Sequence, residues 1–196
     1  MALTKEYIVI KSIEILNRDG FDGLTMRVLA KELDIKAASL YWHFKDKAEL
    51  YAAISESMCE KIIVPSGAIE PAELISDIFR QFRETLLSVT GSVPVFENSV
   101  PFTPARMALI RAVSNSFLAL GVKPENLVTV SNMFNNYVLS FVADECRFKS
   151  GSGERFSGFA DGLAPRDRLI FTVSQDFDGQ FSYGLKLLFA GLARTK

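Results

Sequence analysis

Several side chains able to contact nucleic acid fall together in one short stretch of the sequence. They provide a hydroxyl, a phenol, an indole, an imidazole and an ammonium group, on Ser39, Tyr41, Trp42, His43 and Lys47. Such groups bind phosphate oxygens or base edges. Most of them lie on a predicted helix over residues 37–43, which is too short to bury both large rings. We therefore expect at least one of Tyr41 and Trp42 to be exposed, with core packing as the alternative for either.

A tight turn precedes this helix. The turn, Leu33-Asp34-Ile35-Lys36, joins it to a predicted helix over residues 26–33, for which Thr25 is a suitable N-cap. Two short helices joined in this way have the dimensions of a helix-turn-helix, whose second helix enters the major groove of DNA. Many helical bundles contain similar pairs, so the spacing alone is a weak signal.

Two longer helices are expected on either side of this pair. Residues 4–18 have a broad apolar stripe, with Thr4 as N-cap and Gly20 as the stop. Asp46 and Glu49 have the spacing of a capping box, which predicts a fourth helix that continues to the break at Pro65. We place the boundary between a head and a larger body at this break.

The body is predicted to consist of five or six helices. The expected helical ranges are 71–89, 104–120, 124–149, 166–174 and 177–193, while 90–103 is broken by proline and glycine and 150–165 is rich in glycine. No alternating run of useful length predicts a strand. The fold class is therefore all-α.

Composition limits the possible functions. The net charge is −1 with a pI near 5.9, and residues 1–50 carry equal numbers of acidic and basic side chains. Proteins that coat nucleic acid non-specifically need an excess of Lys and Arg. A protein that binds a specific DNA sequence through a few well-positioned cations is not excluded.

Other functional classes lack their signatures. Cys59 and Cys146 lie far apart, which favours buried free thiols over a disulfide scaffold or a zinc site. The single histidine, His43, has no catalytic or metal-ligating neighbours in sequence, and no glycine-rich phosphate loop precedes a helix. We expect no enzyme activity and no metal or other cofactor. No signal peptide or membrane span is predicted, so the expected location is the cytoplasm without membrane contact.

The head resembles a known family at the residue level. The run Gly23-Leu24-Thr25-Met26-Arg27-Val28-Leu29-Ala30, and the run from Ser39 to Leu50, SLYWHFKDKAEL, closely resemble the DNA-binding head of TetR-family repressors. The segment Phe181–Leu192, FSYGLKLLFAGL, is similar to the final helix of the branch that contains the tetracycline repressors. The resemblance implies a DNA-binding domain over 1–47, a connecting helix over 48–64 and a ligand-binding and dimerisation domain over 65–196.

The resemblance also implies a set of contacts with double-stranded operator DNA. Thr25 would cap its helix and touch phosphate, Arg27 would be the first choice for a base contact, and Ala37 and Ala38 would offer only apolar contact. Lys47 would contact phosphate, although it could simply be solvated. The full expected set is Thr25, Met26, Arg27, Lys36, Ala37, Ala38, Ser39, Tyr41, Trp42, His43 and Lys47.

In the body, the resemblance implies a homodimer and a small-molecule site. The helices at 124–149 and 177–193 of two protomers would form the interface, and small residues such as Gly184 and Gly191 would permit close approach, there or within one chain. Aromatic residues with interleaved polar groups would line the ligand site, although most such rings are core by default. The expected set is Phe79, Phe82, Phe96, Phe102, Phe117, Phe134, Asn135, Tyr137, Phe141 and Asp144.

Two residues depart from the family pattern. In the tetracycline repressors a histidine at the start of the sixth helix holds the drug's magnesium ion, and Phe96 falls at that place here. We therefore expect an apolar or aromatic inducer that binds without metal. Asp34 replaces the glycine usual in the turn, and Asp tolerates the left-handed conformation better than most residues.

The expected mechanism is ligand-controlled repression, and two alternatives stay open. Ligand would shift the fourth helix, change the separation of the two recognition helices and lower affinity for a palindromic operator. A groove-binding head could equally serve an activator. A helical small-molecule carrier would bury Tyr41, Trp42 and Lys47, whereas a regulator would expose them.

Overall fold

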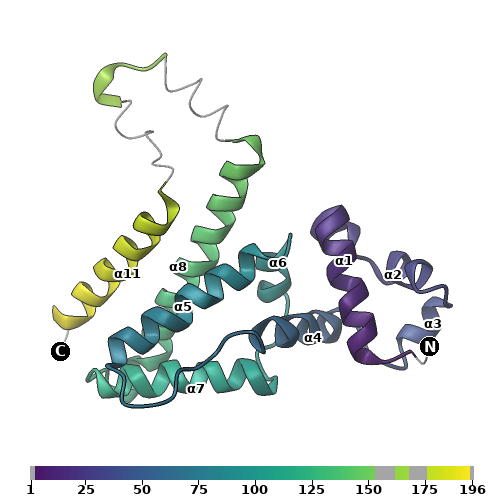
Figure 1. Ribbon diagram of the computed structural model, residues 1–196, viewed down its shortest axis with the longest axis horizontal. Coiled ribbons are helices and arrows are strands. Elements are labelled where there is room, and N and C mark those ends of the chain that lie inside the picture. Colours follow the sequence, from purple (N-terminus) through teal and green to yellow (C-terminus); the bar gives the residue numbers. More distant parts are fainter. Residues whose placement is uncertain (1–2, 153–161, 168–175, 195–196) are drawn as a thin grey trace. The chain divides into compact units, whose positions relative to one another are not determined.

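The computed structural model describes residues 3–152, 162–167 and 176–194 of the chain (Figure 1). All regular elements in these ranges are helical, which confirms the all-α prediction. The chain divides into two compact units, residues 1–120 and 121–196. Each is described by itself.

The first unit begins with four helices, and local capping sets where three of them start. They are α1 (Lys5–Gly23), α2 (Met26–Glu32), α3 (Ala37–Leu40) and α4 (Lys47–Cys59). Thr4 Oγ1 accepts a hydrogen bond from the Tyr7 N–H at 3.2 Å, which confirms the predicted cap of α1. Gly20 has a φ of 73° and kinks α1, and one further turn follows it to Gly23.

The start of α4 is a modified capping box. Asp46 Oδ1 accepts from the Glu49 N–H at 2.8 Å, as the sequence predicts. The Glu49 carboxylate reaches back one residue further than in the standard motif, to the Lys45 N–H at 2.7 Å. Lys5 of α1 lies 3.5 Å from the same carboxylate, so the starts of α1 and α4 share one acidic group.

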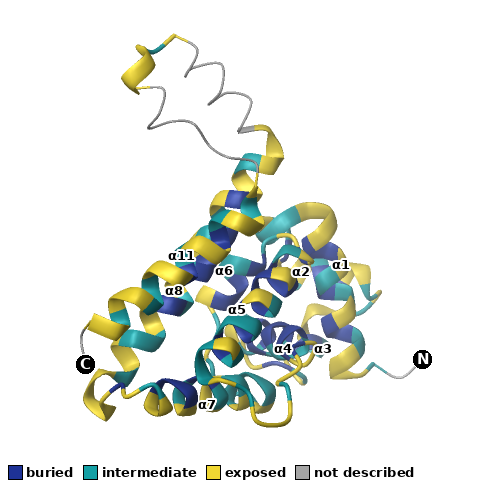
Figure 2. Ribbon diagram, turned by 60° about the vertical axis from the view of Figure 1, so that its left-hand side comes forward, coloured by how far each residue is buried: buried dark blue, intermediate teal, exposed yellow. Residues whose placement is uncertain are grey.

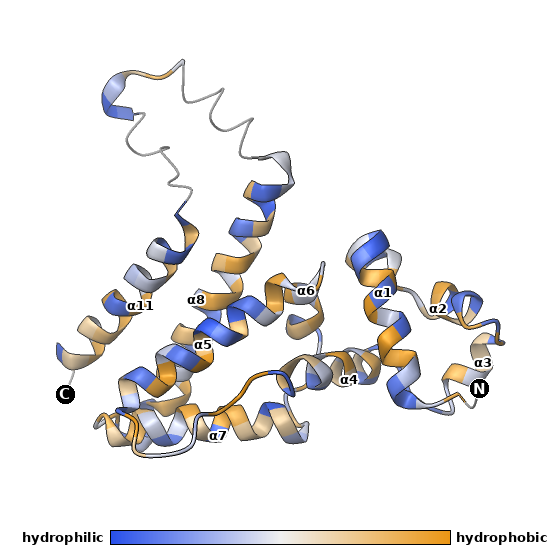
Figure 3. Cartoon of the chain, in the orientation of Figure 1, coloured by the Kyte–Doolittle hydropathy of each residue, from blue (hydrophilic) through white to orange (hydrophobic). Residues whose placement is uncertain are grey.

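Hydrophobic residues of α1 to α4 form the core of this head. α1 packs against α2 and α4, and α2 packs against α3. Ile8, Leu16, Leu40 and Leu50 are completely buried, and Phe44 is 1 % exposed. Figure 2 shows the buried positions and Figure 3 the hydrophobic ones on α1 and α4. Leu40 and Phe44 are therefore core residues.

Besides the first helix, which passes the predicted stop at Gly20 and reaches Gly23, two predicted helix ends in the head were wrong. The third helix ends at Leu40 instead of His43, because the chain closes into a turn in which the N–H groups of His43 and Phe44 both donate to the Leu40 carbonyl, at 2.9 Å. The fourth helix ends at Cys59 instead of reaching residue 64. Beyond it, the side-chain amide of Gln81 binds both the N–H and the carbonyl of Ile63 at 2.9 Å, which holds the chain out of the helix.

Three more helices complete the first unit: α5 (Pro71–Leu87), α6 (Ser92–Glu97) and α7 (Pro104–Ala119). α4 packs against all three. The sequence predicted only a broken segment over 90–103, so α6 is a correction. Pro94 lies in the first turn of α6, where an N–H has no partner within the helix, and so it does not interrupt it.

The second unit contains η1 (Pro124–Asn126), α8 (Leu127–Arg147), η2 (Phe148–Ser152) and α11 (Phe177–Arg194). Tyr137 of α8 donates to the Phe181 carbonyl of α11 at 3.0 Å. A Cβ atom at Gly184 would lie 2.1 Å from the Tyr137 hydroxyl, so glycine is required there for the two helices to approach within one chain. The helix predicted over 166–174 lies mostly outside the described residues. Within the described ranges, no helix is long and apolar enough to cross a membrane.

Candidate functional site

The α2–α3 pair has the geometry of a helix-turn-helix. Thr25 Oγ1 accepts from the Val28 N–H at 3.1 Å and fixes the start of α2. In the turn, Asp34 has a φ of 52°, the left-handed conformation that the sequence predicted for this residue. The Ile35 N–H donates to the Ala30 carbonyl at 3.0 Å and closes the turn.

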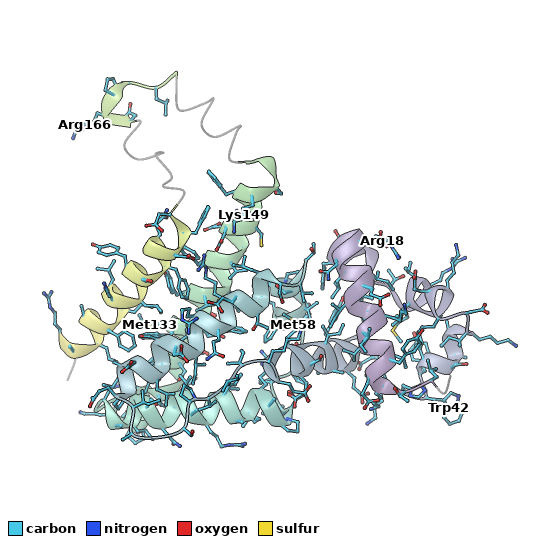
Figure 4. The ribbon with its side chains drawn as sticks, in the orientation of Figure 1. Arg18, Trp42, Met58, Met133, Lys149 and Arg166 are labelled. Atoms are coloured by element: carbon cyan, nitrogen blue, oxygen red, sulfur yellow. The ribbon has the colours of Figure 1, made fainter. Side chains whose placement is uncertain are left out.

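An ion-pair cluster ties α1 to α2 behind this turn. Arg18 of α1 lies 3.0 Å from the Glu32 carboxylate at the end of α2 and 3.0 Å from Asp19 (Figure 4). The hydrogen bond that Arg18 donates lowers the pKa of Glu32, and donation to the carboxylates of Asp19 and Glu32 raises the pKa of Arg18. The group is solvent-exposed, so it orients α2 more than it stabilises the head.

The predicted DNA-contacting residues share one region of the head and are mostly exposed. Tyr41 is 54 % exposed and Trp42, which is labelled in Figure 4, is 90 % exposed. Exposed as well are Thr25, Arg27, Lys36, Ala37 and Ala38, while Met26, Ser39, His43 and Lys47 are half-buried. The exposed indole of Trp42 leaves a large apolar surface in water, which favours the contact function over core packing.

Lys47 occupies a position that the sequence did not reveal. Its ammonium lies 5.5 Å from the ring centroid of Phe21 and 5.2 Å from that of Tyr51. These two rings are stacked, with centroids 5.3 Å apart. Phe21 and Tyr51 therefore position the Lys47 side chain. Lys47 and Tyr51 have the spacing of neighbours on one helix face, so their contact could have been predicted from the sequence. The contact between Lys47 and Phe21 depends on the fold.

In the first unit, four of the predicted ligand-lining rings are buried and one is not. Phe79, Phe82, Phe96 and Phe117 are at most 8 % exposed, and Phe82 packs edge-on against Phe96 at 5.1 Å. Phe102 is 79 % exposed.

In the second unit, the predicted ligand-lining residues lie along α8. Phe134 is 2 % exposed and packs against Phe189, at 5.0 Å between centroids. Tyr137 stacks on Phe181 at 5.5 Å, and Phe141 contacts the same ring at 5.3 Å. Asn135 is half-buried. Asp144 is exposed and pairs with Arg147 at 2.5 Å.

Metal-binding and thiol chemistry have few supporting features. Among the residues that the structure describes, no group of three His, Cys, Asp or Glu side chains could hold a metal ion. Cys59 is buried and Cys146 is exposed, so the expectation that both are buried is wrong for Cys146. Burial raises the pKa of the Cys59 thiol to about 12, which makes it unreactive near neutral pH.

Two family models match the chain and together cover most of it. The model described as bacterial regulatory proteins, tetR family, matches residues 8–54. The model described as tetracyclin repressor-like, C-terminal domain, matches residues 72–196. The first contains the α2–α3 pair, and the second begins in the first turn of α5.

Individual proteins resemble the chain over its full length. The tetracycline repressor protein class A from transposon 1721 of Escherichia coli is 27 % identical over 96 % of this chain and 90 % of its own. The solved structure of BioQ with its natural double-stranded DNA operator is 26 % identical, with a TM-score of 0.72 over 98 % of this chain and 99 % of that one. Streptomyces coelicolor ActR in complex with actinorhodin shares the fold, with a TM-score of 0.84 at 24 % identity, over 100 % of this chain and 99 % of that one.

Proposed function

Because this chain belongs to the TetR family of bacterial transcriptional regulators, we propose that it is a repressor that binds a palindromic operator as a homodimer and is released by a small molecule. The family consists of regulators, not enzymes. The observation that carries the proposal is the joint exposure of Arg27, Tyr41 and Trp42 on a correctly formed helix-turn-helix. A carrier protein would have no use for this arrangement.

The proposed contacts follow from the position of each side chain. Arg27, in the first turn of α2, offers the forked donor pair that reads guanine. Tyr41 and Trp42 follow α3 and would lie along the sugar-phosphate backbone. Ala37 and Ala38 form the exposed start of α3 and can contribute only apolar contacts, for example to thymine methyl groups.

Exposed apolar side chains on two helices of the second unit support the homodimer. Val128 and Met133 of α8 are 71 % and 55 % exposed, and Tyr183 and Leu187 of α11 are 63 % and 55 % exposed. Two helices of one chain that both carry exposed apolar side chains fit an isologous interface with a second copy. A two-fold dimer places its recognition helices about 34–36 Å apart, which requires a palindromic operator.

The proposed inducer is an apolar or aromatic molecule that binds without metal. The buried rings of Phe82 and Phe96 in the first unit supply the kind of aromatic surface such a molecule needs. A thermal-shift screen of aromatic compounds with and without EDTA tests this point. Compounds that stabilise the protein should do so equally in EDTA, and stabilisation that EDTA abolishes would contradict a metal-free site.

A mobility-shift titration with DNA from the protein's own upstream region tests the DNA-binding proposal. Wild type should bind with two chains per duplex, and Arg27→Ala should weaken binding by about 1–3 kcal/mol. Arg111→Ala is a matched control, because Arg111 is an exposed arginine on α7. Equal losses for the two variants would show that Arg27 makes no particular contact.

A further inference from the structure

The first turn of α7 carries a half-buried guanidinium group that has no carboxylate partner. Nη1 of Arg106 donates to Ser99 Oγ at 2.7 Å. Among the residues that the structure describes, the remaining side-chain N–H groups of Arg106 have no acceptor, and no carboxylate forms a salt bridge with it. Charged groups that are withdrawn from water are normally paired. Arg106 therefore has an unused capacity to bind an anion.

Two acidic groups come close to Arg106, and neither balances its charge. Glu56 of α4 accepts from the backbone N–H groups of Ala105 and Arg106, at 2.7 and 3.2 Å, so its two oxygens cap α7 and do not bind the guanidinium. Desolvation lowers the pKa of Arg106, and the Cys59 thiol opposes this shift. Burial raises the pKa of Cys59 to about 12, so this thiol carries no charge near neutral pH.

Neighbouring side chains hold the guanidinium of Arg106 beside buried aromatic rings. It lies over the ring of Phe96, 4.8 Å from the centroid, and Phe96 packs edge-on against Phe82. Ser99, which accepts from Arg106, lies 3.0 Å from Ser55 of α4 between the two hydroxyl oxygens. A cation fixed in this way next to apolar rings is what a binding site for an aromatic anion requires.

Thr103 adds a second unused polar group in the same region. As the N-cap residue of α7, it would ordinarily accept the Arg106 N–H, which Glu56 binds instead. Thr103 Oγ1 is buried and, within the described part of the chain, has no hydrogen-bond partner. Buried polar atoms without a partner are uncommon, so this hydroxyl is a second candidate donor to a ligand.

We propose that Arg106 binds an anionic group of the inducer, which is therefore an aromatic acid such as an aryl carboxylate. A guanidinium and a carboxylate pair through two parallel N–H···O hydrogen bonds, and the aromatic body of the ligand would contact Phe82 and Phe96. A neutral aromatic molecule would leave the charge of Arg106 unbalanced. This inference rests on the proposed function, because it takes the bound molecule to be the inducer.

Isothermal titration calorimetry of the full-length protein without DNA tests the proposal. The probes are benzoate, 2-naphthoate and anthracene-2-carboxylate, each compared at neutral pH with its primary amide, which has nearly the same shape and no charge. In at least one pair the acid should bind about tenfold more tightly than the amide, because hydrogen bonds between charged groups are stronger. No acid preference in any pair, including a failure of all three acids to bind, would overturn the proposal.

Three variants assign the acid preference to one side chain. Arg106→Met keeps an unbranched side chain over Phe96 and should bind the acid and the amide equally. Arg106→Lys keeps the charge without the forked donors and should retain a smaller preference than wild type. Arg111→Met changes an exposed arginine of the same helix and should behave as wild type. Full acid preference in Arg106→Met would overturn the proposal, and so would an unreduced preference in Arg106→Lys if Arg106→Met does not fold.

Urea unfolding without ligand separates a binding role of Arg106 from a structural one. Arg106→Met should leave the midpoint unchanged or raise it, because the variant removes a desolvated charge that has no counter-charge. A lower midpoint together with an intact acid preference would show that Arg106 only stabilises the fold.

Anisotropy of the labelled upstream fragment keeps this test separate from that of the proposed function. Acids that bind through Arg106 should also release the DNA. Binding that Arg106→Met abolishes, without release of DNA from wild type, would support the site and contradict only the proposed induction.

Discussion

Lys47 offers a sharp test of how the head contacts DNA, because its ammonium has two possible partners. In the structure it lies over the rings of Phe21 and Tyr51. On operator DNA it is proposed to bind a phosphate. Lys47→Met keeps an unbranched apolar side chain against both rings and removes only the charge, so that the two contributions can be separated.

The two contributions have different magnitudes and different readouts. Loss of the cation–π contact at a partly exposed site should lower the free energy of unfolding by about 0.5–1 kcal/mol. Loss of one phosphate contact reduces the slope of log K against log salt by about 0.9, and a dimer loses two, about 1.8 in total. When the salt concentration rises from about 50 to about 200 mM, the variant should therefore lose about 12-fold less operator affinity than wild type loses.

Anisotropy titrations of a labelled operator fragment at several salt concentrations measure this slope, and urea unfolding measures the stability. Lys61→Met is the matched control, because Lys61 is exposed and follows the end of α4, about 20 Å from the start of that helix. An unchanged slope in Lys47→Met, together with the loss of stability, would show that Lys47 is purely structural. The phosphate assignment would then be wrong.

Three further predictions concern the head and the thiols. Asp46→Ala removes the cap of α4 and should lower the unfolding free energy by about 1 kcal/mol in urea, and an unchanged midpoint would contradict the cap. Asp34→Val places a β-branched residue at a φ of 52° and should cost about 1–2 kcal/mol in the same assay, whereas a neutral result would mean that the turn relaxes freely. With Ellman's reagent, the exposed Cys146 should react in the folded protein and the buried Cys59 only after denaturation, so rapid reaction of both native thiols would argue against a buried Cys59.

Features that depend on neighbouring residues in the sequence could be predicted, and the caps show why. Thr4, Thr25 and Asp46 each bind an N–H three residues away, so type and spacing suffice to identify them. The left-handed Asp34 could be foreseen for the same reason, since few residues tolerate that conformation. The exposure of at least one of Tyr41 and Trp42 was predicted from the small size of the head, and in the structure both are exposed.

Features that depend on distant contacts could not be predicted. α4 ends at Cys59 because Gln81 of α5 binds the backbone of Ile63, and nothing within residues 60–64 encodes that contact. The cap of α7 by Glu56 likewise joins residues far apart in the chain. Pro94 was interpreted as a breaker because its place in the first turn of α6 depends on where that helix starts. The grouping of Lys47 with Phe21 also required the fold.

The central claim is that the exposed α2–α3 head of this TetR-family protein reads a DNA sequence. Trp42 is the only tryptophan of the chain and is 90 % exposed, so its fluorescence reports directly on the proposed interface. The most direct measurement is a titration of Trp42 fluorescence with the upstream fragment and with a shuffled fragment of equal length and composition. The account predicts that the upstream fragment changes the signal at concentrations at least about 10³-fold lower than the shuffled one. Coincident titration curves for the two fragments, or no change in Trp42 fluorescence with either, would contradict it.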